Sequence, residues 1–290
     1  MDHFVGHDML LQAAVDAAFA QVETCHHAMS AHDSTSDLAL LLRNVGSAVR
    51  VRPCTFAVLT LAAELHRLSH GLFNVACGAE LEARGRLPVW PGAVKNYATD
   101  AAAIELQPDD HIKLHAPLRL DLGGIAKGYA VDLAVESLMA QGATTGCVNA
   151  GGDLRVFGTA TQAVALRHPA HPQTLLQAGT LKNGSAATSG AYFASPAARL
   201  PDDLSAEIGD ICDIGDIGDI VNPRTQTRIV QSGSHTVFTA SCAVADGLTK
   251  VAALDVFEAQ HWPRLAAHFN ASSLHISEHG ISTYRSAAGI

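Results

Sequence analysis

The chain has 290 residues, of which 48% are hydrophobic and 16% charged, and its formal net charge is −9. This composition is typical of a globular protein with enough apolar material for a large core. Since no stretch approaches the roughly 18 consecutive apolar residues of a membrane helix, and lysine and arginine form no cluster, we expect no membrane segment and no nucleic-acid partner.

Helical periodicity dominates the first part of the chain. Three helices are predicted: residues 8–30, a segment with Ser36 or Asp37 as its N-cap, and a segment from just after Pro53 to Gly71. Two prolines within 85–100 predict a loop. The stretch "HIKLHAPLRLDLGG" then predicts a hairpin that turns near Ala116 and Pro117, and residues 126–142 predict another helix.

Strand patterns follow. "GCVNAGGDLRVFG" predicts two strands joined by a glycine turn, "TQAVALRHP" predicts a further strand, and Asn183–Gly184 is a hairpin signal. Helices and strands interleave without a regular strand–helix–strand rhythm. The pattern therefore favours an α+β domain over a doubly wound parallel sheet.

Cysteine and histidine usage points away from disulfides and zinc. The six cysteines include no C-x-x-C pair, and the 16 histidines show no zinc-ligand spacing. The N-terminus shows no basic region followed by a cleavage site, so we expect a cytoplasmic protein.

The segment "LDLGGIAKGYAVD" has the composition of an anion site. Gly123 and Gly124 allow a ligand to approach the backbone, and a helix that opens at Lys127 presents amides and a positive charge. A phosphate or pyrophosphate fits this pattern. A plain strand–turn–helix with Lys127 in solvent fits it as well.

Three more short stretches have residues of the same kind, each with a simpler structural explanation. "VNAGGD" is either a turn whose backbone amides face a ligand or a tight β-turn closed by the side chain of Asp153. "AATSG" either contacts a ligand or ends a strand, and "VNPR" is a turn signal. The residues of the first two that qualify as ligand contacts are Asn149, Gly151, Gly152, Thr188 and Ser189.

An acid and a base interrupt the small and apolar run "TASCAVADGLTKVAAL". Asp246 and Lys250 are four residues apart, which places them on one face of a helix. An exposed pair of this kind contributes about 0.3–0.5 kcal/mol. The apolar surroundings favour a site over a surface pair.

Taken in order, these stretches resemble the ApbE family, the FAD:protein FMN transferases. The resemblance runs from about residue 36 to about residue 254, and it is carried by "GLFNVACGAEL", "LDLGGIAKGYAVD", "VNAGGDLRVFG", "AATSGAY", "DIVNPRTQ" and "VFTASCAVADGLTK". It implies one domain over 1–290, with antiparallel sheets, covering helices and FAD in a cleft. We find no match here to the family's N-terminal M-G-T strand, and we expect no exported or lipid-anchored start.

The resemblance implies that FAD is cleaved and that FMN is joined through a phosphoester bond to a threonine or serine of an acceptor flavoprotein, with release of AMP. It places a backbone ligand of Mg²⁺ at Gly124 and a carboxylate ligand at Asp246. The flavin-nucleotide contacts fall on Phe73, Asn74, Asp121, Lys127 and Ile220.

Several positions depart from the family pattern. Lys250 stands where the pattern has a metal-binding threonine, and Asp219 stands where it has a histidine. A charged ammonium cannot ligate Mg²⁺, but paired with Asp246 it can offer a positive charge to the pyrophosphate. Three readings therefore compete with FMN transfer. They are an FAD pyrophosphatase, a protein that binds FAD or another nucleotide without chemistry, and a subunit or assembly partner that keeps only the fold.

Overall fold

The structure is a computed structural model, and it describes residues 2–90, 94, 96–171, 173–190, 220–229, 233–255, 261–277 and 280–284. Its helices are α1 (Asp2–Met29), α2 (Asp37–Arg43), α3 (Pro53–Leu68), α4 (Gly78–Ala83), α5 (Ala126–Ala140), α6 (Cys242–Asp255) and α7 (Trp262–His268), with a 3₁₀ turn at Ala101–Ala103. Its strands are β1 (Ala48–Arg50), β2 (Ile104–Gln107), β3 (His111–Leu114), β4 (Gly146–Ala150), β5 (Asp153–Phe157), β6 (Gln162–Arg167), β7 (Leu175–Leu181), β8 (Gly184–Gly190), β9 (Ile220–Asn222), β10 (Thr227–Ile229), β11 (Gly233–Thr239), β12 (Ser272–Ser277) and β13 (Gly280–Tyr284). Helices mixed with antiparallel sheets confirm the predicted α+β class.

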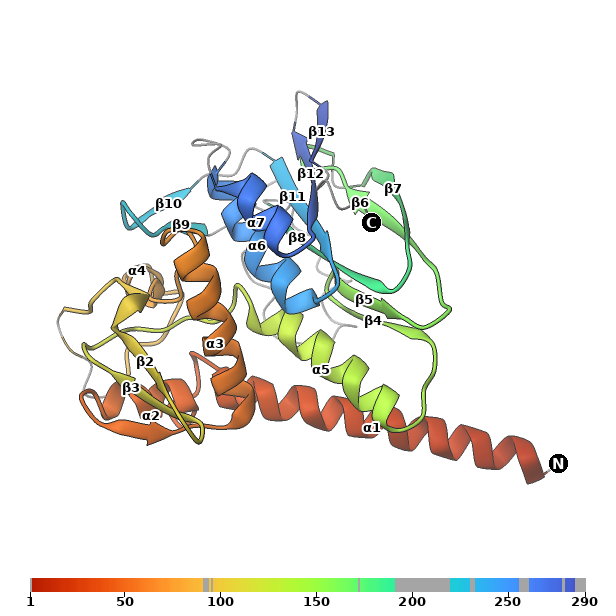
Figure 1. The fold of residues 1–290 in the computed structure, drawn as a ribbon, viewed down its shortest axis with the longest axis horizontal. Coiled ribbons are helices and arrows are strands. Elements are labelled where there is room, and N and C mark those ends of the chain that lie inside the picture. The colour runs from red at the N-terminus through yellow and green to blue at the C-terminus, as the bar shows by residue number, and fades with distance from the viewer. Residues whose placement is uncertain are drawn as a thin grey trace.

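The C-terminal half of the chain forms a six-stranded antiparallel sheet, with the strands in the order β13-β12-β11-β8-β5-β4. Helix α6 packs on β8 and β11, and α5 packs on β4 and β5. Below α5, the long helix α1 runs along the edge of the molecule (Figure 1). The opposite face of the sheet is apolar and is covered by the β6–β7 hairpin, through the buried side chains of Leu154, Val156, Val164, Leu166, Leu181, Ala186 and Ile276.

A smaller sheet, in the order β1-β3-β2, lies on the other side of α3 from the large sheet (Figure 1). Here the predicted hairpin over 111–124 is wrong, because β3 pairs with β2 and β1 instead. Asp109 and Asp110 adopt φ of 60° and 59°, which lets the chain reverse between β2 and β3. After Pro117, the Arg119 carbonyl accepts from the amide of Gly78, the first residue of α4, at 3.0 Å.

The hairpin predicted at Asn183–Gly184 is also wrong. Asn183 does turn the chain, with φ of 48°. However, β7 before the turn pairs with β6, whereas β8 after it pairs with β5 and β11. The glycine turn between β4 and β5 is confirmed, and these two strands pair directly.

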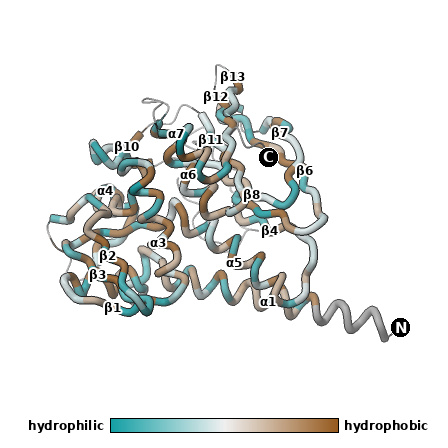
Figure 2. The backbone as a smooth tube through the Cα atoms, in the orientation of Figure 1, coloured by the Kyte–Doolittle hydropathy of each residue, from teal (hydrophilic) through white to brown (hydrophobic). Residues whose placement is uncertain are grey.

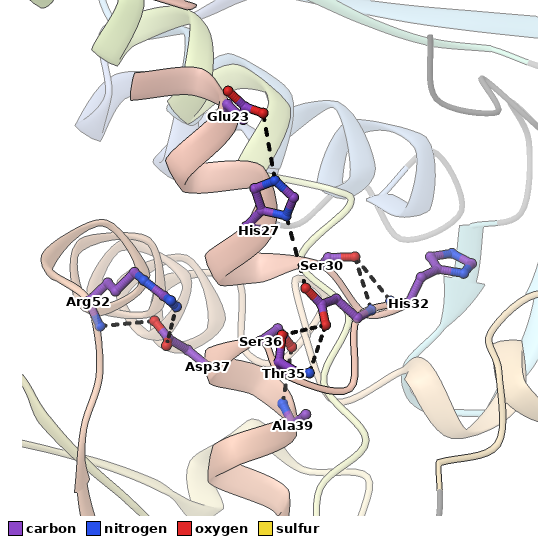
Figure 3. A network of polar contacts seen from close by, with 10 residues as sticks. Glu23, His27, Ser30, His32, Thr35, Ser36, Asp37, Ala39 and Arg52 are labelled. Carbon is purple, nitrogen blue, oxygen red and sulfur yellow. Dashed lines mark hydrogen bonds and ion pairs between the residues drawn. The ribbon is translucent and has the colours of Figure 1, made fainter. Parts of the chain in front are cut away.

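Polar contacts fix the junction of α1, α2 and α3 (Figure 3). Ser36 is the N-cap of α2, and its hydroxyl accepts a hydrogen bond from the Ala39 amide at 3.3 Å. Asp37 is buried and accepts from the backbone and guanidinium of Arg52 and from the hydroxyl of Thr55. The predicted helix boundaries near Ser36 and Pro53 are thereby confirmed.

The main core draws on both halves of the described chain, from Cys25 in α1 to Ala271 before β12. Hydrophobic colours follow α3 and α6 in Figure 2, as expected for helices that contribute to this core. A buried arginine lies within it: Arg119 is fully buried and donates to Glu82 at 2.8 Å, and its guanidinium lies 3.7 Å from the centre of the Trp90 ring. Among the helices of the described ranges, none has the length and apolar character needed to cross a membrane.

Candidate functional site: an ion cluster between two helices

Helix α6 is buried almost throughout. Each of its residues except Lys250 is classed as buried, so the acid within it needs partners inside the protein. Asp246 is completely buried and forms an ion pair with the ammonium group of Lys250. The same ammonium donates to the carbonyl oxygen of Asp246 at 3.1 Å. The reading of Asp246 and Lys250 as an exposed surface pair is therefore wrong.

Helix α5 supplies the second side of this site. The backbone amide of Gly128 donates to Oδ2 of Asp246 at 3.2 Å. Burial opposes ionisation of Asp246, but the charges of Lys250 and Lys127 outweigh burial and lower its pKa. Asp246 is thus an anion held by an ammonium on one oxygen and by a helix N-terminal amide on the other.

Lys127 links Asp246 to a second acid. Its ammonium lies 3.3 Å from Oδ2 of Asp153, and the charges of Asp246 and then Asp153 raise its pKa. Burial and the neighbouring Asp246 raise the pKa of Asp153. Lys127 exposes 60% of its side chain, so it is open to solvent as well as ion-paired. We call Lys127, Asp153, Asp246 and Lys250 the ion cluster.

Two glycines of α5 and the turn before it make this geometry possible. A Cβ on Gly128 would lie 2.3 Å from the carbonyl oxygen of Cys242, so only glycine lets the two helices approach closely. A Cβ on Gly124 would lie 3.2 Å from Cε of Lys250, so the lysine stem packs over this glycine. Gly123 is exposed, and its amide donates to Asp121 at 3.2 Å.

The β4–β5 turn precedes Asp153 directly. The Asn149 side chain accepts from the Gly152 amide at 2.9 Å, and Gly151 and Gly152 adopt φ of 66° and 104°. The tight β-turn is present, but the side chain of Asn149 closes it, whereas the structural explanation predicted that Asp153 would. Asn149, Gly151 and Gly152 are also exposed, so this turn forms part of the surface beside the ion cluster.

Thr188 and Ser189 point to opposite faces of the sheet, as neighbours on a strand do. Ser189 faces α6 and bonds the hydroxyl of Thr249 at 2.8 Å, next to the ion cluster. The hydroxyl of Thr188 bonds that of Thr236 at 2.9 Å. Both lie on the sheet face that the β6–β7 hairpin covers, with Ala186 and Leu274. The structure thus brings Ser189 to the site and leaves Thr188 on the other face.

Of the two predicted nucleotide contacts near residue 73, one is buried in the core and the other lines a cavity. Phe73 is only 4% exposed and belongs to the core, where it lies close to Gly247 of α6. Asn74 bonds the Thr99 carbonyl at 2.8 Å and lines a cavity of about 400 Å³. The other residues that line this cavity are His66, Arg67, His70, Gly71, Thr99, Asp100, Pro223 and Arg224.

Two more predicted nucleotide contacts are Asp121, just before the Gly123–Gly124 turn, and Ile220, the first residue of β9. Asp121 is half-buried, burial raises its pKa, and its amide donates to the Val75 carbonyl at 2.9 Å. Ile220 begins β9 and packs against the main core. Asp219 lies outside the described residues.

One residue in the site was not singled out from the sequence, and another has a partner that the sequence did not indicate. Asp153 pairs with Lys127, and Asp132 binds the first turn of α6, accepting from the amides of Cys242 and Ala243 at 3.0 and 2.9 Å. The available signal for Asp132 was its position four residues after Gly128, on the helix face that meets α6. Asp153 was expected only as a residue of the glycine turn, and its pairing with Lys127 had no local signal because Lys127 lies on a different element.

A sequence model described as the ApbE family matches residues 2–273. The chain belongs to the ApbE family. An FAD:protein FMN transferase of Rhodobacter capsulatus is 29% identical over 283 residues, which cover 92% of this chain and 50% of that protein. One of Treponema pallidum is 29% identical over 164 residues, 51% of this chain and 45% of that protein. The chain thus spans about half the length of the curated relatives that it matches.

Solved ApbE structures have the same fold. The flavin transferase ApbE of Vibrio cholerae gives a TM-score of 0.70 at 22% identity, covering 96% of this chain and 88% of that one. The ApbE protein of Thermotoga maritima gives 0.73 at 22% identity, covering 96% and 90%. These likenesses confirm the predicted ApbE-like fold.

The residues at Asp246 do not fit the Mg²⁺ ion that the ApbE resemblance places there. The Lys250 ammonium already bonds the carboxylate and the carbonyl oxygen of Asp246. The neighbouring Thr249 is fully buried and turns its hydroxyl to Ser189 and to the Asp246 carbonyl. Within the described ranges, no three His, Cys, Asp or Glu side chains converge as metal ligands.

Proposed function

We propose that this ApbE-family chain binds FAD and transfers its FMN half to an acceptor flavoprotein. The names of its relatives in Rhodobacter capsulatus and Treponema pallidum support this activity. The observation that carries the proposal is the ion cluster, where Lys127 and Lys250 lie around Asp246 beside the Gly123–Gly124 turn. Two ammonium groups next to a helix N-terminus suit a pyrophosphate.

In the proposed reaction, a hydroxyl oxygen of threonine or serine on the acceptor attacks the phosphorus on the FMN side of the pyrophosphate. A phosphoester bond forms, the bond between that phosphorus and the bridging oxygen breaks, and AMP leaves with the electron pair. The hydroxyl proton passes to a base. Negative charge grows on the departing AMP phosphate, and fixed positive groups stabilise it.

The residues of this chain have separable roles in that scheme. Lys127 stays protonated between Asp246 and Asp153 and keeps its charge exposed toward a ligand. Asp246 holds Lys250 in place, and Gly128 fixes Asp246 from the backbone. Asp219, at the family's histidine position, is our candidate for the base or for a phosphate contact.

The remaining nucleotide contacts stay predictions. We assign the surface beside the ion cluster to FAD through Asp121, Asn149, Gly151, Gly152 and Ser189, and the cavity at Asn74 to a further part of the same ligand. Phe73, Thr188 and Ile220 would contribute to FAD binding through their backbone atoms or by packing that shapes the site. We treat residues 1–290 as a single domain in this scheme.

The test incubates the purified full chain with FAD and a flavoprotein acceptor domain. We expect the acceptor to gain the mass of FMN, measured by intact-mass spectrometry. AMP should appear in an equal amount, measured by chromatography. Lys127→Met should slow both by about tenfold or more, because it removes a fixed charge at the pyrophosphate. Lys182→Met, on an exposed turn after β7, is the matched control and should act like the native chain.

Each other outcome has its own meaning. Free FMN and AMP without an adduct would show an FAD pyrophosphatase. Bound FAD without any turnover, across several acceptors and metal ions, would show a binding protein. Absence of both binding and turnover would refute the proposed function.

A further inference from the structure

The ion cluster contains a cation that belongs to the protein. Lys250 exposes 20% of its side chain, and the carboxylate of its partner Asp246 exposes 1%. The ammonium bonds both the Asp246 side chain and the Asp246 carbonyl, so the lysine is tied to one residue at two points. An arrangement of this kind is built into the helix and does not depend on a ligand.

The surroundings are shaped to receive this lysine. Its stem lies over Gly124, where a Cβ would come within 3.2 Å of Cε and 3.7 Å of Cγ and Cδ. Gly124 is also the position to which the ApbE resemblance assigned a metal-binding carbonyl. The lysine therefore fills the space between Gly124 and Asp246 that the family's metal was expected to take.

The charges also argue against an added dication. When both carboxylates are ionised, Lys127 and Lys250 balance Asp153 and Asp246. A divalent ion on Asp246 would lie beside the Lys250 ammonium and would repel it. Thr249 offers no replacement ligand, because its hydroxyl is buried against Ser189 and the Asp246 carbonyl.

We propose that Lys250 is the resident cation of this site and that the chain holds the pyrophosphate of its nucleotide without a divalent metal ion. This inference rests on the proposed function, since it concerns the same FAD site. It assigns to Lys250 a direct role in ligand binding, and it makes Asp246 the residue that positions Lys250.

The experiment measures FAD binding to the full chain by flavin fluorescence, once in EDTA and once with millimolar Mg²⁺. For the native chain we expect the two dissociation constants to agree within about twofold, because the cation is already present. Lys250→Thr should weaken binding in EDTA by about tenfold or more and recover with Mg²⁺. Lys250→Gln removes the charge without supplying a hydroxyl ligand, so it should weaken binding and not recover. Lys182→Thr is the control for removing a surface lysine.

A second readout does not involve FAD. Mn²⁺, titrated against each protein and followed by its paramagnetic resonance signal, should bind Lys250→Thr at one site and leave the native chain without that site. Circular dichroism checks that each variant is folded. If Lys250→Thr fails to fold, the native chain and Lys250→Gln decide the question.

The outcomes separate this inference from the proposed function. Native FAD binding that falls more than tenfold in EDTA overturns the inference and leaves FMN transfer standing. If the native chain binds no FAD in either buffer, the proposed function fails. The Mn²⁺ titration then decides the inference alone, and a stoichiometric site in the native chain that Asp246→Asn abolishes would overturn it.

Discussion

Replacing Asp132 by alanine should loosen the first turn of the helix that carries Asp246 and Lys250. Asp132 is 6% exposed, and it accepts from the Ser241 hydroxyl at 2.7 Å and from the Cys242 and Ala243 amides at 3.0 and 2.9 Å. It therefore acts as an N-cap for α6 that comes from α5. Its negative charge also lies at the positive, N-terminal end of the α6 dipole, which stabilises the helix.

The expected cost follows from these contacts. Asp132 accepts from two buried amides, and each amide left without an acceptor costs about 1–3 kcal/mol. We expect Asp132→Ala to lower the free energy of unfolding by about 2–6 kcal/mol. Asp132→Asn keeps one acceptor oxygen and loses the charge, so its effect should lie between those of alanine and the native residue.

Urea unfolding followed by circular dichroism measures this difference. Glu136→Ala, one turn further along α5 and exposed, is the matched control and should change stability by less than about 0.5 kcal/mol. FAD binding should weaken with Asp132→Ala, because α6 would no longer hold Asp246 against Gly128. An Asp132→Ala chain within 1 kcal/mol (about fivefold in the unfolding equilibrium) of the native one would refute the capping role.

Three further changes test other parts of the structure. Gly128→Ala should destabilise the chain by about 3 kcal/mol, the upper end for overpacking, because the new Cβ would lie 2.3 Å from the Cys242 carbonyl oxygen; an unchanged urea midpoint would mean that α5 and α6 separate freely. Glu82→Ala leaves the buried Arg119 without its carboxylate and should cost about 3–5 kcal/mol in thermal or urea unfolding, whereas a native-like transition would contradict the importance of this pair. Burial lowers the pKa of His235 to about 3 in the folded chain. In the unfolded chain this histidine is protonated below about pH 6.5, whereas in the folded chain it stays neutral. Stability should therefore fall as the pH falls through this window, and from pH 7 to 5 the native chain should lose about 2 kcal/mol more than His235→Gln; equal losses in both proteins would show that His235 does not contribute.

Much of the local structure could be predicted from the sequence. Helical periodicity, the Ser36 cap and the glycine turn before Asp153 are local signals, and the structure confirms the elements that they predict. Family membership was also carried by short local stretches. The errors concern pairing: Asn183 signals that the chain reverses, but it does not determine that β8 pairs with β5 and β11.

The candidate site shows the same division. The spacing of Asp246 and Lys250 predicted that they share a helix face, and the structure places them in contact. The ion pair of Asp153 and the role of Asp132 could not be predicted, because they depend on which helix lies against which strand or helix. Gly128 shows why: its significance is a contact with Cys242, which lies 114 positions along the chain.

The β6–β7 hairpin has a further consequence for how this chain can change. It leaves the large sheet after β5 and returns at β8, and these two strands are paired neighbours, with Val156 opposite Gly184. The residues between them are thus an excursion whose two ends meet at adjacent points of an unbroken sheet. Its length and surface can vary without altering any strand that carries the ion cluster, provided that some apolar cover remains over Leu154, Val156 and Ala186.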